Sequence, residues 1–174
     1  MIDTNITWSG HVFNILREAG VKQIAYVPDA GHTDLINLSI KDNDLIQVPL
    51  TTEEEGVAVL AGAWLGGQKG VLLMQSSGVG NVINMLSVAD ECRFPLLMIV
   101  TMRGEWGEFN PWQVPMGQAT EKVLEAMKVI VLRAYTPFDV AETVQAAAKL
   151  AFGAGRKVAV LISQKIIGQK DWQK

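Results

Sequence analysis

Short apolar segments alternate along the chain with longer segments in which apolar residues recur every three or four positions. The short segments have the composition of buried β-strands, and the longer ones have the periodicity of amphipathic helices. The pattern predicts strands at residues 23–27, 45–49, 71–74, 96–101, 129–132 and 158–162. It predicts helices at 8–19, 30–39, 51–65, 118–127 and 137–152, a further helix from a loop at 75–81 to about 93, and a polar loop at 102–118. This alternation favours a doubly wound α/β fold, with a largely parallel six-stranded sheet and helices on both faces.

Residues 50–67 combine a polar, acidic start with an apolar, glycine-rich continuation. Thr51 and Thr52 each have a Glu three residues later, so two overlapping capping boxes are expected at the start of a helix. Gly66-Gly67 is expected to end this helix. The expected apolar stripe is Val57, Leu60, Ala61, Trp64 and Leu65, beside a smooth face of Ala58, Gly62 and Gly66.

Three consecutive glutamates occupy the first turn of this helix. At about 100° per residue, Glu55 points away from the apolar stripe, whereas Glu53 and Glu54 flank it. One of these two is therefore expected to be partly buried. Acidic residues in a first turn also complement the helix dipole, and this simpler explanation remains open on the pattern alone.

Polar residues follow the predicted strands at 28–29, 51–55, 76–81 and 102–118. The carboxyl ends of parallel strands share one edge of the sheet, where ligands bind in such folds, so these residues are expected to converge on one rim. The 76–80 segment, Ser-Ser-Gly-Val-Gly, can present backbone N–H groups to an anion or a ring nitrogen. It is not a Rossmann fingerprint, because Ile83 occupies the third glycine position, and no Gly-Lys-Ser/Thr of a P-loop follows.

Composition narrows the classes of function. The chain has 174 residues, 49% of them hydrophobic, and a net charge of -3, which gives no reason to expect nucleic acid or a membrane as partner. We expect a single domain over residues 1–174, with its core at about 7–168, a frayed tail at 169–174 and no leader peptide. Cys92 is the only cysteine, which fits a cytoplasmic location. With only His11 and His32, a histidine-rich metal site is excluded.

Several motifs occur in a fixed order along the chain. They are Val27-Pro28-Asp29, then Glu54 two residues before Gly56 and an Ala/Gly-rich helix, then the 76–80 segment, then Phe94-Pro95-Leu96 before a strand. This order resembles the pyrimidine-binding domain of thiamine-diphosphate-dependent 2-keto acid decarboxylases and acetolactate synthases, over roughly residues 7–168. Arg-Gly-Glu at 103–105 and Gln-Val-Pro-Met-Gly at 113–117 look most like the sulfopyruvate decarboxylase alpha subunit and the matching half of phosphonopyruvate decarboxylase.

The resemblance implies that Glu54 hydrogen-bonds N1′ of the cofactor's aminopyrimidine ring and so favours the imino tautomer, whose nitrogen removes the thiazolium C2 proton. Correspondence with the family, rather than helical phase, selects Glu54 over Glu53. Asp29 and His32 are further catalytic candidates. The expected cofactor-binding residues are Glu54, Ser76, Ser77, Gly78, Gly80 and Asn81, and the expected substrate-binding residues are Arg103, Asn110 and Gln113.

Several of these assignments compete with a purely structural explanation. Asp29 is equally suited to cap the helix that follows it, and His32 to be an exposed helix residue at the rim. Arg103 suits a carboxylate or sulfonate, but a surface pairing with Glu105 or Glu108 competes with that role. No pair of adjacent histidines follows His32, so a mechanism that uses such a pair is not expected here.

Members of the family bind the diphosphate through Mg²⁺ on a Gly-Asp-Gly stretch, which this sequence lacks. The resemblance therefore implies a heteromeric lyase whose second subunit carries the diphosphate- and Mg²⁺-binding domain, with self-association in addition. Trp106 and Trp112 are candidate anchors for such contacts. The expected substrate is a small 2-keto acid, with sulfopyruvate favoured and phosphonopyruvate or another 2-keto acid as rivals. A non-catalytic assembly or regulatory subunit is the alternative from another class.

Overall fold

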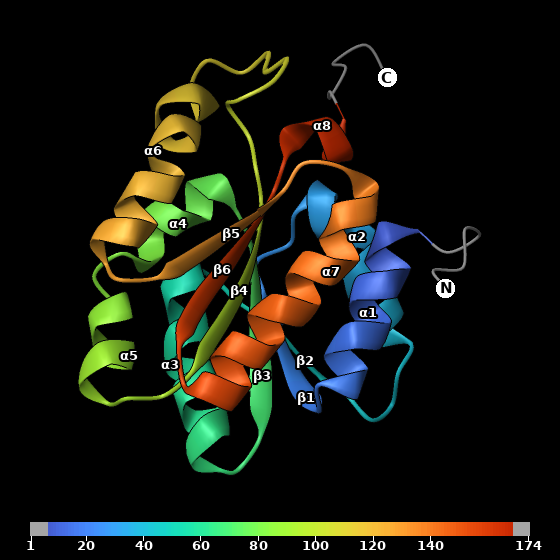
Figure 1. Ribbon diagram of the computed structural model, residues 1–174, viewed down its shortest axis with the longest axis vertical. Coiled ribbons are helices and arrows are strands. Elements are labelled where there is room, and N and C mark those ends of the chain that lie inside the picture. Colours follow the sequence, from blue (N-terminus) through green and yellow to red (C-terminus); the bar gives the residue numbers. More distant parts are fainter. Residues whose placement is uncertain (1–6, 169–174) are drawn as a thin grey trace.

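A computed structural model describes residues 7–168. Its centre is a sheet of six parallel strands in the order β2-β1-β3-β4-β6-β5 (Figure 1). The strands are β1 (Val21–Tyr26), β2 (Ile46–Pro49), β3 (Lys69–Gln75), β4 (Leu96–Thr101), β5 (Ile130–Ala134) and β6 (Lys157–Ile162). The predicted doubly wound α/β fold with six strands is confirmed. The tail predicted at 169–174 lies outside the described residues.

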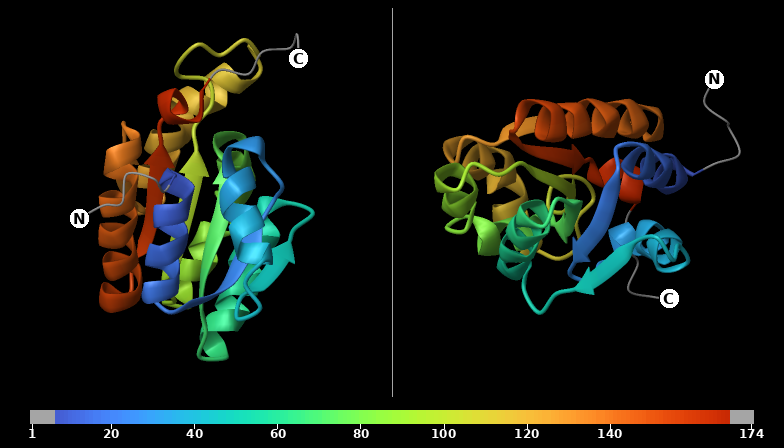
Figure 2. Two further views of the ribbon diagram at one scale, coloured as in Figure 1. Left: turned by 90° about the vertical axis from the view of Figure 1, so that its right-hand side faces the viewer. Right: turned by 90° about the horizontal axis from the view of Figure 1, so that it is seen from below.

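Helices cover both faces of the sheet (Figure 2). One layer holds α1 (Trp8–Glu18), α2 (Thr33–Ile40) and α7 (Pro137–Ala148), and the other holds α3 (Glu53–Leu65), α4 (Ser76–Val82), α5 (Leu86–Glu91) and α6 (Gln113–Ala126). The short elements are η1 (Ala30–His32), η2 (Lys149–Gly153) and α8 (Gln164–Ile167). Successive strand residues enter opposite cores, Leu73 with α1, α2 and α7, and Leu72 with the other layer. None of the helices within residues 7–168 is long and apolar enough to cross a membrane.

The strand order reverses between β1 and β3. The chain leaves β1 for β2 on one side and, after β2, crosses back to β3 on the other. The helices that follow β1 and β3, α2 and α4, pack on opposite faces of the sheet. Such a topological switch point is where open α/β sheets bind ligands, outside the carboxyl ends of the strands. Asp29, after β1, and Gln75, at the end of β3, border it.

Three predicted boundaries differ from the structure. Of the segment predicted as a loop at 75–81, Gln75 ends β3 and residues 76–81 belong to helix α4, which a break at Ile83 to Met85 separates from α5. Neither Gly78 nor Gly80 has a positive φ, so these glycines do not form a turn. Helix α6 begins at Gln113 rather than at 118, and α7 ends in the π-helical turn η2. The pattern identified the apolar segments correctly, but a glycine-rich, polar helix start has the composition of a loop.

Helix α3 begins without the predicted capping boxes. Thr52 is its N-cap, but the Thr52 hydroxyl donates to the carboxylate of Glu54 at 3.2 Å and accepts no backbone N–H. The apolar stripe is also rotated, because Gly56 and Ala63 face the sheet while Trp64 and Leu65 are 37% and 88% exposed. Small residues face inward since α3 packs very closely on β3. Helix α3 ends before Gly66-Gly67, as predicted.

Candidate functional site

The three glutamates at the start of α3 have different environments. Glu53 is 8% exposed, and its Oε2 accepts a hydrogen bond of 2.7 Å from Asn81 Nδ2. Glu54 is half-buried, and among residues 7–168 it accepts only the Thr52 hydroxyl described above. Glu55 is exposed and accepts a backbone N–H from the preceding turn at 2.9 Å. The prediction that Glu53 or Glu54 is buried is confirmed, and the buried one is Glu53. Glu54 keeps unused acceptor capacity.

Helix α4 packs on Glu53 through Gly78. A Cβ added to Gly78 would lie 2.3 Å from Glu53 Oε1, so the Glu53 side chain fills the space that the glycine leaves. Ser76 is fully buried, and its hydroxyl accepts a hydrogen bond of 3.0 Å from the backbone N–H of Arg103. These contacts correct the prediction of an open glycine loop, because Ser76 and Gly78 are engaged inside the protein. Of the predicted cofactor-binding residues in α4, Ser77 is half-buried, and Gly80 and Asn81 are exposed.

Asp29 connects the ends of β3 and β4. Its Oδ1 accepts from Gln75 Nε2 at 2.8 Å, and its Oδ2 accepts from Thr101 Oγ1 at 2.7 Å and from the backbone N–H of Gly31 at 3.0 Å. Asp29 therefore caps η1, as the structural explanation predicted, and also joins two other segments of the rim. Gln75 in turn accepts the Ser77 hydroxyl at 2.9 Å. Gln75 and Thr101 were missed in the sequence, where only their positions at strand ends distinguished them.

His32 is not exposed at the rim, contrary to the prediction. Its ring is fully buried, and Nε2 lies 3.2 Å from the Met74 carbonyl oxygen and 3.1 Å from that of Ile99. Carbonyl oxygens only accept, so Nε2 carries the proton, and Nδ1 has no hydrogen-bond partner in the described part of the chain. Burial lowers the pKa of His32, against the opposing charge of nearby Asp29. A neutral ring enclosed in this way does not reach a substrate, which removes the physical basis for its predicted catalytic role.

Arg103 forms a buried ion pair with Glu108. Its Nε and Nη2 donate to the two carboxylate oxygens at 2.6 and 2.5 Å, and the two side chains are 9% and 3% exposed. Glu108 also accepts from the backbone N–H groups of Gly104 and Asn110 and from Gln164 Nε2. Arg103 first of all, and then these donors, lower the pKa of Glu108 to about 2. Pairing of Arg103 with Glu108 was one of the alternatives left open by the sequence, where it was expected at the surface. In the structure the pair is buried, and it occupies two guanidinium nitrogens that were predicted to bind the substrate.

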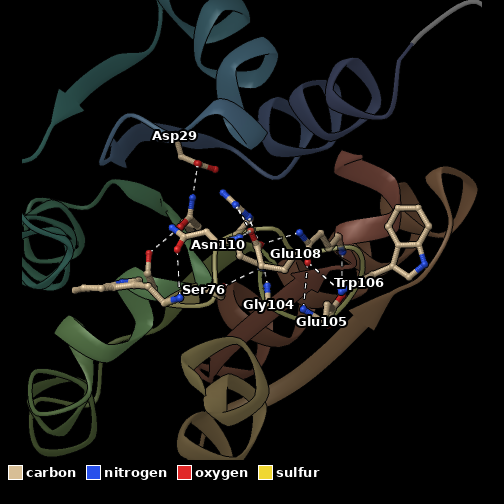
Figure 3. Close-up of polar contacts among 12 residues, drawn as sticks. Asp29, Ser76, Gly104, Glu105, Trp106, Glu108 and Asn110 are labelled. Carbon is tan, nitrogen blue, oxygen red and sulfur yellow. Dashed lines mark hydrogen bonds and ion pairs between the residues drawn. The ribbon is translucent and has the colours of Figure 1, made fainter. Parts of the chain in front are cut away.

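The connection between β4 and α6 is fastened to α8. Glu105 Oε1 accepts the backbone N–H of Gln164 at 2.9 Å, and Gln164 Oε1 accepts the backbone N–H groups of Glu105 and Trp106 at 3.1 Å each (Figure 3). Glu105 also pairs with Arg133. Trp106 and Trp112 remain 42% and 76% exposed on this connection. Their exposure is compatible with a role as partner contacts, which stays a prediction.

Asn110 and Gln113 lie at the end of the same connection. The Asn110 Oδ1 accepts the backbone N–H of Trp112 at 3.2 Å, so this side chain shapes the turn before α6. Gln113 is the first residue of α6, and its Oε1 is buried and has no hydrogen-bond partner among the residues that the structure describes. Leaving a buried acceptor unpaired costs about 1–3 kcal/mol. Gln113 Oε1 is therefore suited to receive a donor from a ligand.

Comparisons with known proteins place the chain in a family. The sequence model "Thiamine pyrophosphate enzyme, N-terminal TPP binding domain" matches residues 6–110. The sulfopyruvate decarboxylase subunit alpha of Methanococcus maripaludis is 36% identical over 87% of this chain and 91% of that protein. The corresponding subunit of Methanocaldococcus jannaschii is 34% identical, over 86% and 89%. Phosphonopyruvate decarboxylase of Streptomyces viridochromogenes is 42% identical over 61% of this chain, but only 27% of its own length is covered.

A solved structure shares the fold. The 2-oxoglutarate:ferredoxin oxidoreductase from Magnetococcus marinus superposes on 97% of this chain and 33% of its own with a TM-score of 0.70. At 15% identity, this likeness concerns the fold alone. The family match spans more than half of the chain, and the alpha subunits align over nearly their whole length. The chain belongs to the thiamine pyrophosphate enzymes, as their N-terminal TPP-binding domain.

Proposed function

We propose that this chain is the alpha subunit of a heteromeric sulfopyruvate decarboxylase, which uses thiamine diphosphate to convert sulfopyruvate into sulfoacetaldehyde and CO₂. Two relatives of that name align with nearly the whole chain. The structural observation that carries the proposal is the state of Glu54. Of the three glutamates in the first turn of α3, Glu53 accepts a hydrogen bond from the Asn81 side chain, and Glu55 accepts one from the backbone N–H of the preceding turn. The Glu54 carboxylate accepts the Thr52 hydroxyl and can accept further hydrogen bonds.

The residues present fit an aminopyrimidine ring, which carries N–H donors. Glu54 offers a half-buried carboxylate whose one acceptor contact among the described residues is the Thr52 hydroxyl. Bound thiamine diphosphate supplies the electron sink for the loss of CO₂. The role of Glu54 is to hold a proton at N1′, which a carboxylate partly removed from water does more firmly than solvent would. Ser77, Gly80 and Asn81 are proposed to border the cofactor, while Ser76 and Gly78 fix α4 in position.

The substrate-side residues belong to the connection between β4 and α6. We propose that Asn110 and Gln113 contact the 2-keto acid. Because Glu108 holds the Arg103 guanidinium, Arg103 is proposed to act mainly by keeping this connection ordered. Asp29 was a catalytic candidate, but Gln75, Thr101 and Gly31 donate to its two carboxylate oxygens, so we propose that it positions neighbouring side chains at the switch point.

A second subunit is proposed to supply the Mg²⁺ and diphosphate site. Within residues 7–168, no group of three or more His, Cys, Asp or Glu side chains is placed to hold a metal ion. The outer side of α3, with Ala58, Gly62 and Leu65, is exposed and apolar. A helix that is apolar on all sides is normally covered, so we propose that this side contacts the second subunit. Residues 1–174 are proposed to form one domain, and the exposed free thiol of Cys92 suits a reducing cytoplasm, where we place the complex.

Glu54→Gln in the complex of this chain with its partner subunit tests the proposal. We expect CO₂ release from sulfopyruvate to fall at least about 10²-fold, because an amide cannot hold the proton at N1′ as a carboxylate does. Glu55→Gln is the matched control, since Glu55 is exposed and its amide oxygen can still accept the backbone N–H. An unchanged rate for Glu54→Gln would instead favour the non-catalytic assembly or regulatory subunit. Phosphonopyruvate, assayed in parallel, decides between the two substrates.

A further inference from the structure

A chain of hydrogen bonds crosses the switch point between β1 and β3. Ser77 Oγ donates to Gln75 Oε1 at 2.9 Å, and Gln75 Nε2 donates to Asp29 Oδ1 at 2.8 Å. The other carboxylate oxygen of Asp29 is held by the backbone N–H of Gly31 and the hydroxyl of Thr101. Asp29, Gln75 and Ser77 are half-buried and lie after β1, at the end of β3 and in the first turn of α4, respectively.

The charge of Asp29 fixes the direction of each bond in this chain. A carboxylate only accepts hydrogen bonds, so Gln75 has to present its amide nitrogen to Asp29 and its amide oxygen to Ser77. The amide oxygen also only accepts, so Ser77 donates its single hydroxyl proton to Gln75. What the Ser77 hydroxyl can still offer to a ligand is therefore a lone pair.

We propose that the Ser77 hydroxyl accepts a hydrogen bond from an N–H or O–H group of the bound ligand. Asp29, acting through Gln75, is the positioning residue that makes Ser77 an acceptor rather than a donor toward this ligand. The inference rests on the proposed function, which places the ligand at this rim. The carboxylate and sulfonate oxygens of the 2-keto acid are acceptors and are repelled by the lone pairs of Ser77. The matching donor lies either on the aminopyrimidine ring or on a group that forms from the substrate.

Replacing Asp29 by Asn is expected to reverse the donor and acceptor roles in both hydrogen bonds between residue 29, Gln75 and Ser77. Gly31 and Thr101 donate to Oδ2, so the amide oxygen of the new side chain takes that place and its nitrogen faces Gln75. Gln75 then turns its own oxygen toward that nitrogen and its nitrogen toward Ser77. Ser77 becomes the acceptor of Gln75, and its proton points at the ligand, where a donor then meets a donor.

The experiment uses the reconstituted complex of this chain with its partner subunit. The dissociation constant for thiamine diphosphate is measured by tryptophan fluorescence, and kcat/KM by CO₂ release from sulfopyruvate. Ser77→Ala should either raise the dissociation constant or lower kcat/KM by about fivefold, which is the effect of losing one neutral hydrogen bond. A larger dissociation constant for thiamine diphosphate assigns the donor to the cofactor. A lower kcat/KM with an unchanged dissociation constant assigns the donor to a group derived from the substrate. Ser77→Thr keeps the hydroxyl and should retain the wild-type value.

The decisive measurement is the combination of changes. Asp29→Asn alone should cost more than Ser77→Ala, and adding Ser77→Ala to Asp29→Asn should restore the level of Ser77→Ala. In a Gln75→Leu background, Asp29→Asn should change the quantity that Ser77→Ala affects by less than twofold, because the hydrogen-bonded connection between Asp29 and Ser77 is then cut. Additive losses for Asp29→Asn and Ser77→Ala would overturn the inference, as would an effect of Asp29→Asn that survives Gln75→Leu.

The controls separate this inference from the proposed function. Thermal unfolding of each variant checks that the fold is kept, and if Asp29→Asn does not fold, equal losses in Ser77→Ala and Ser77→Thr overturn the inference. A complex that binds thiamine diphosphate but shows additive losses contradicts the role of Ser77 alone. A complex that binds no thiamine diphosphate contradicts the proposed function and this inference with it.

Discussion

Glu108 holds the connection between β4 and α6 in place, and removal of its charge is expected to destabilise the protein. Its carboxylate accepts five hydrogen bonds, two of them from Arg103. The side chain is 3% exposed, so solvent screens these contacts little. Glu108→Gln keeps the shape of the side chain but leaves the buried guanidinium without a counter-charge, which is costly in a protein interior.

The shifted pKa gives the size of the effect. Folding lowers the pKa of Glu108 from 4.5 to about 2, and one pKa unit corresponds to 1.36 kcal/mol, which gives about 3 kcal/mol. Because the folded-state pKa is the lower one, this stabilisation is fully present above the unfolded-state pKa and is lost as the pH falls through about 2. At pH 7, Glu108→Gln should therefore lower the free energy of unfolding by about 3 kcal/mol. For a domain of this size, Tm should fall by roughly 6–12 °C.

Urea unfolding of Glu108→Gln and the unchanged chain, from pH 7 down to pH 3, measures this effect. At pH 3 the difference in free energy of unfolding should shrink to roughly 1.5 kcal/mol, because Glu108 binds a proton in the unfolded state at this pH while it is still mostly ionised in the folded state. Glu121→Gln is the control, since Glu121 pairs with Arg133 but is 46% exposed, and exposed pairs contribute about 1 kcal/mol or less. Equal stability of both chains at pH 7, or a difference that does not shrink on acidification, would refute this account of Glu108.

Two further substitutions probe α4 and α3. Gly78→Ala should lower the free energy of unfolding by roughly 1–3 kcal/mol in urea titrations, because the new Cβ displaces the Glu53 carboxylate. Gly62→Ala is the control, because a Cβ at Gly62 would meet nothing within 4 Å. This variant of the isolated chain should be as stable as the unchanged chain or up to about 1 kcal/mol more stable. Leu65→Lys should weaken binding of the partner subunit at least about tenfold in titration calorimetry, because Leu65 lies on the proposed partner surface. Leu65 is exposed, so the free energy of unfolding of the isolated chain should stay within about 0.5 kcal/mol. Ile40→Lys is the control: Ile40 is exposed on the opposite layer, so this change should leave binding of the partner unchanged.

The strands and their order of appearance could be predicted because burial leaves a local signal. Residues 71–74 and 96–100 are apolar throughout, since helices cover both faces of the sheet, and each segment can be recognised without knowledge of its neighbours. The rim could be predicted to the same extent, because the chain has to leave every parallel strand at the same edge. Segments could thus be assigned to the site, but not the contacts of their side chains.

Those contacts join residues far apart in the sequence. Glu53 and Asn81 are 28 positions apart, Asp29 and Gln75 are 46, and Asp29 and Thr101 are 72. Helical phase left Glu53 and Glu54 equivalent, because the partner that distinguishes them lies on α4. Glycine was ambiguous for the same reason. In α4 it serves close packing by its small size, and a sequence does not distinguish this from the conformational freedom of a loop.

The position of Glu54 on α3 connects the proposed chemistry to subunit association. Glu54, Ala58, Gly62 and Leu65 follow one another at intervals of four, four and three residues, so they lie along one side of the helix. Gly56 and Ala63 face the sheet, which leaves that side directed outward. The carboxylate proposed to hold the cofactor therefore belongs to the same surface as the apolar residues proposed to hold the partner. By linkage, any effect of the bound cofactor on the affinity for the partner is matched by an equal effect of the bound partner on the affinity for the cofactor.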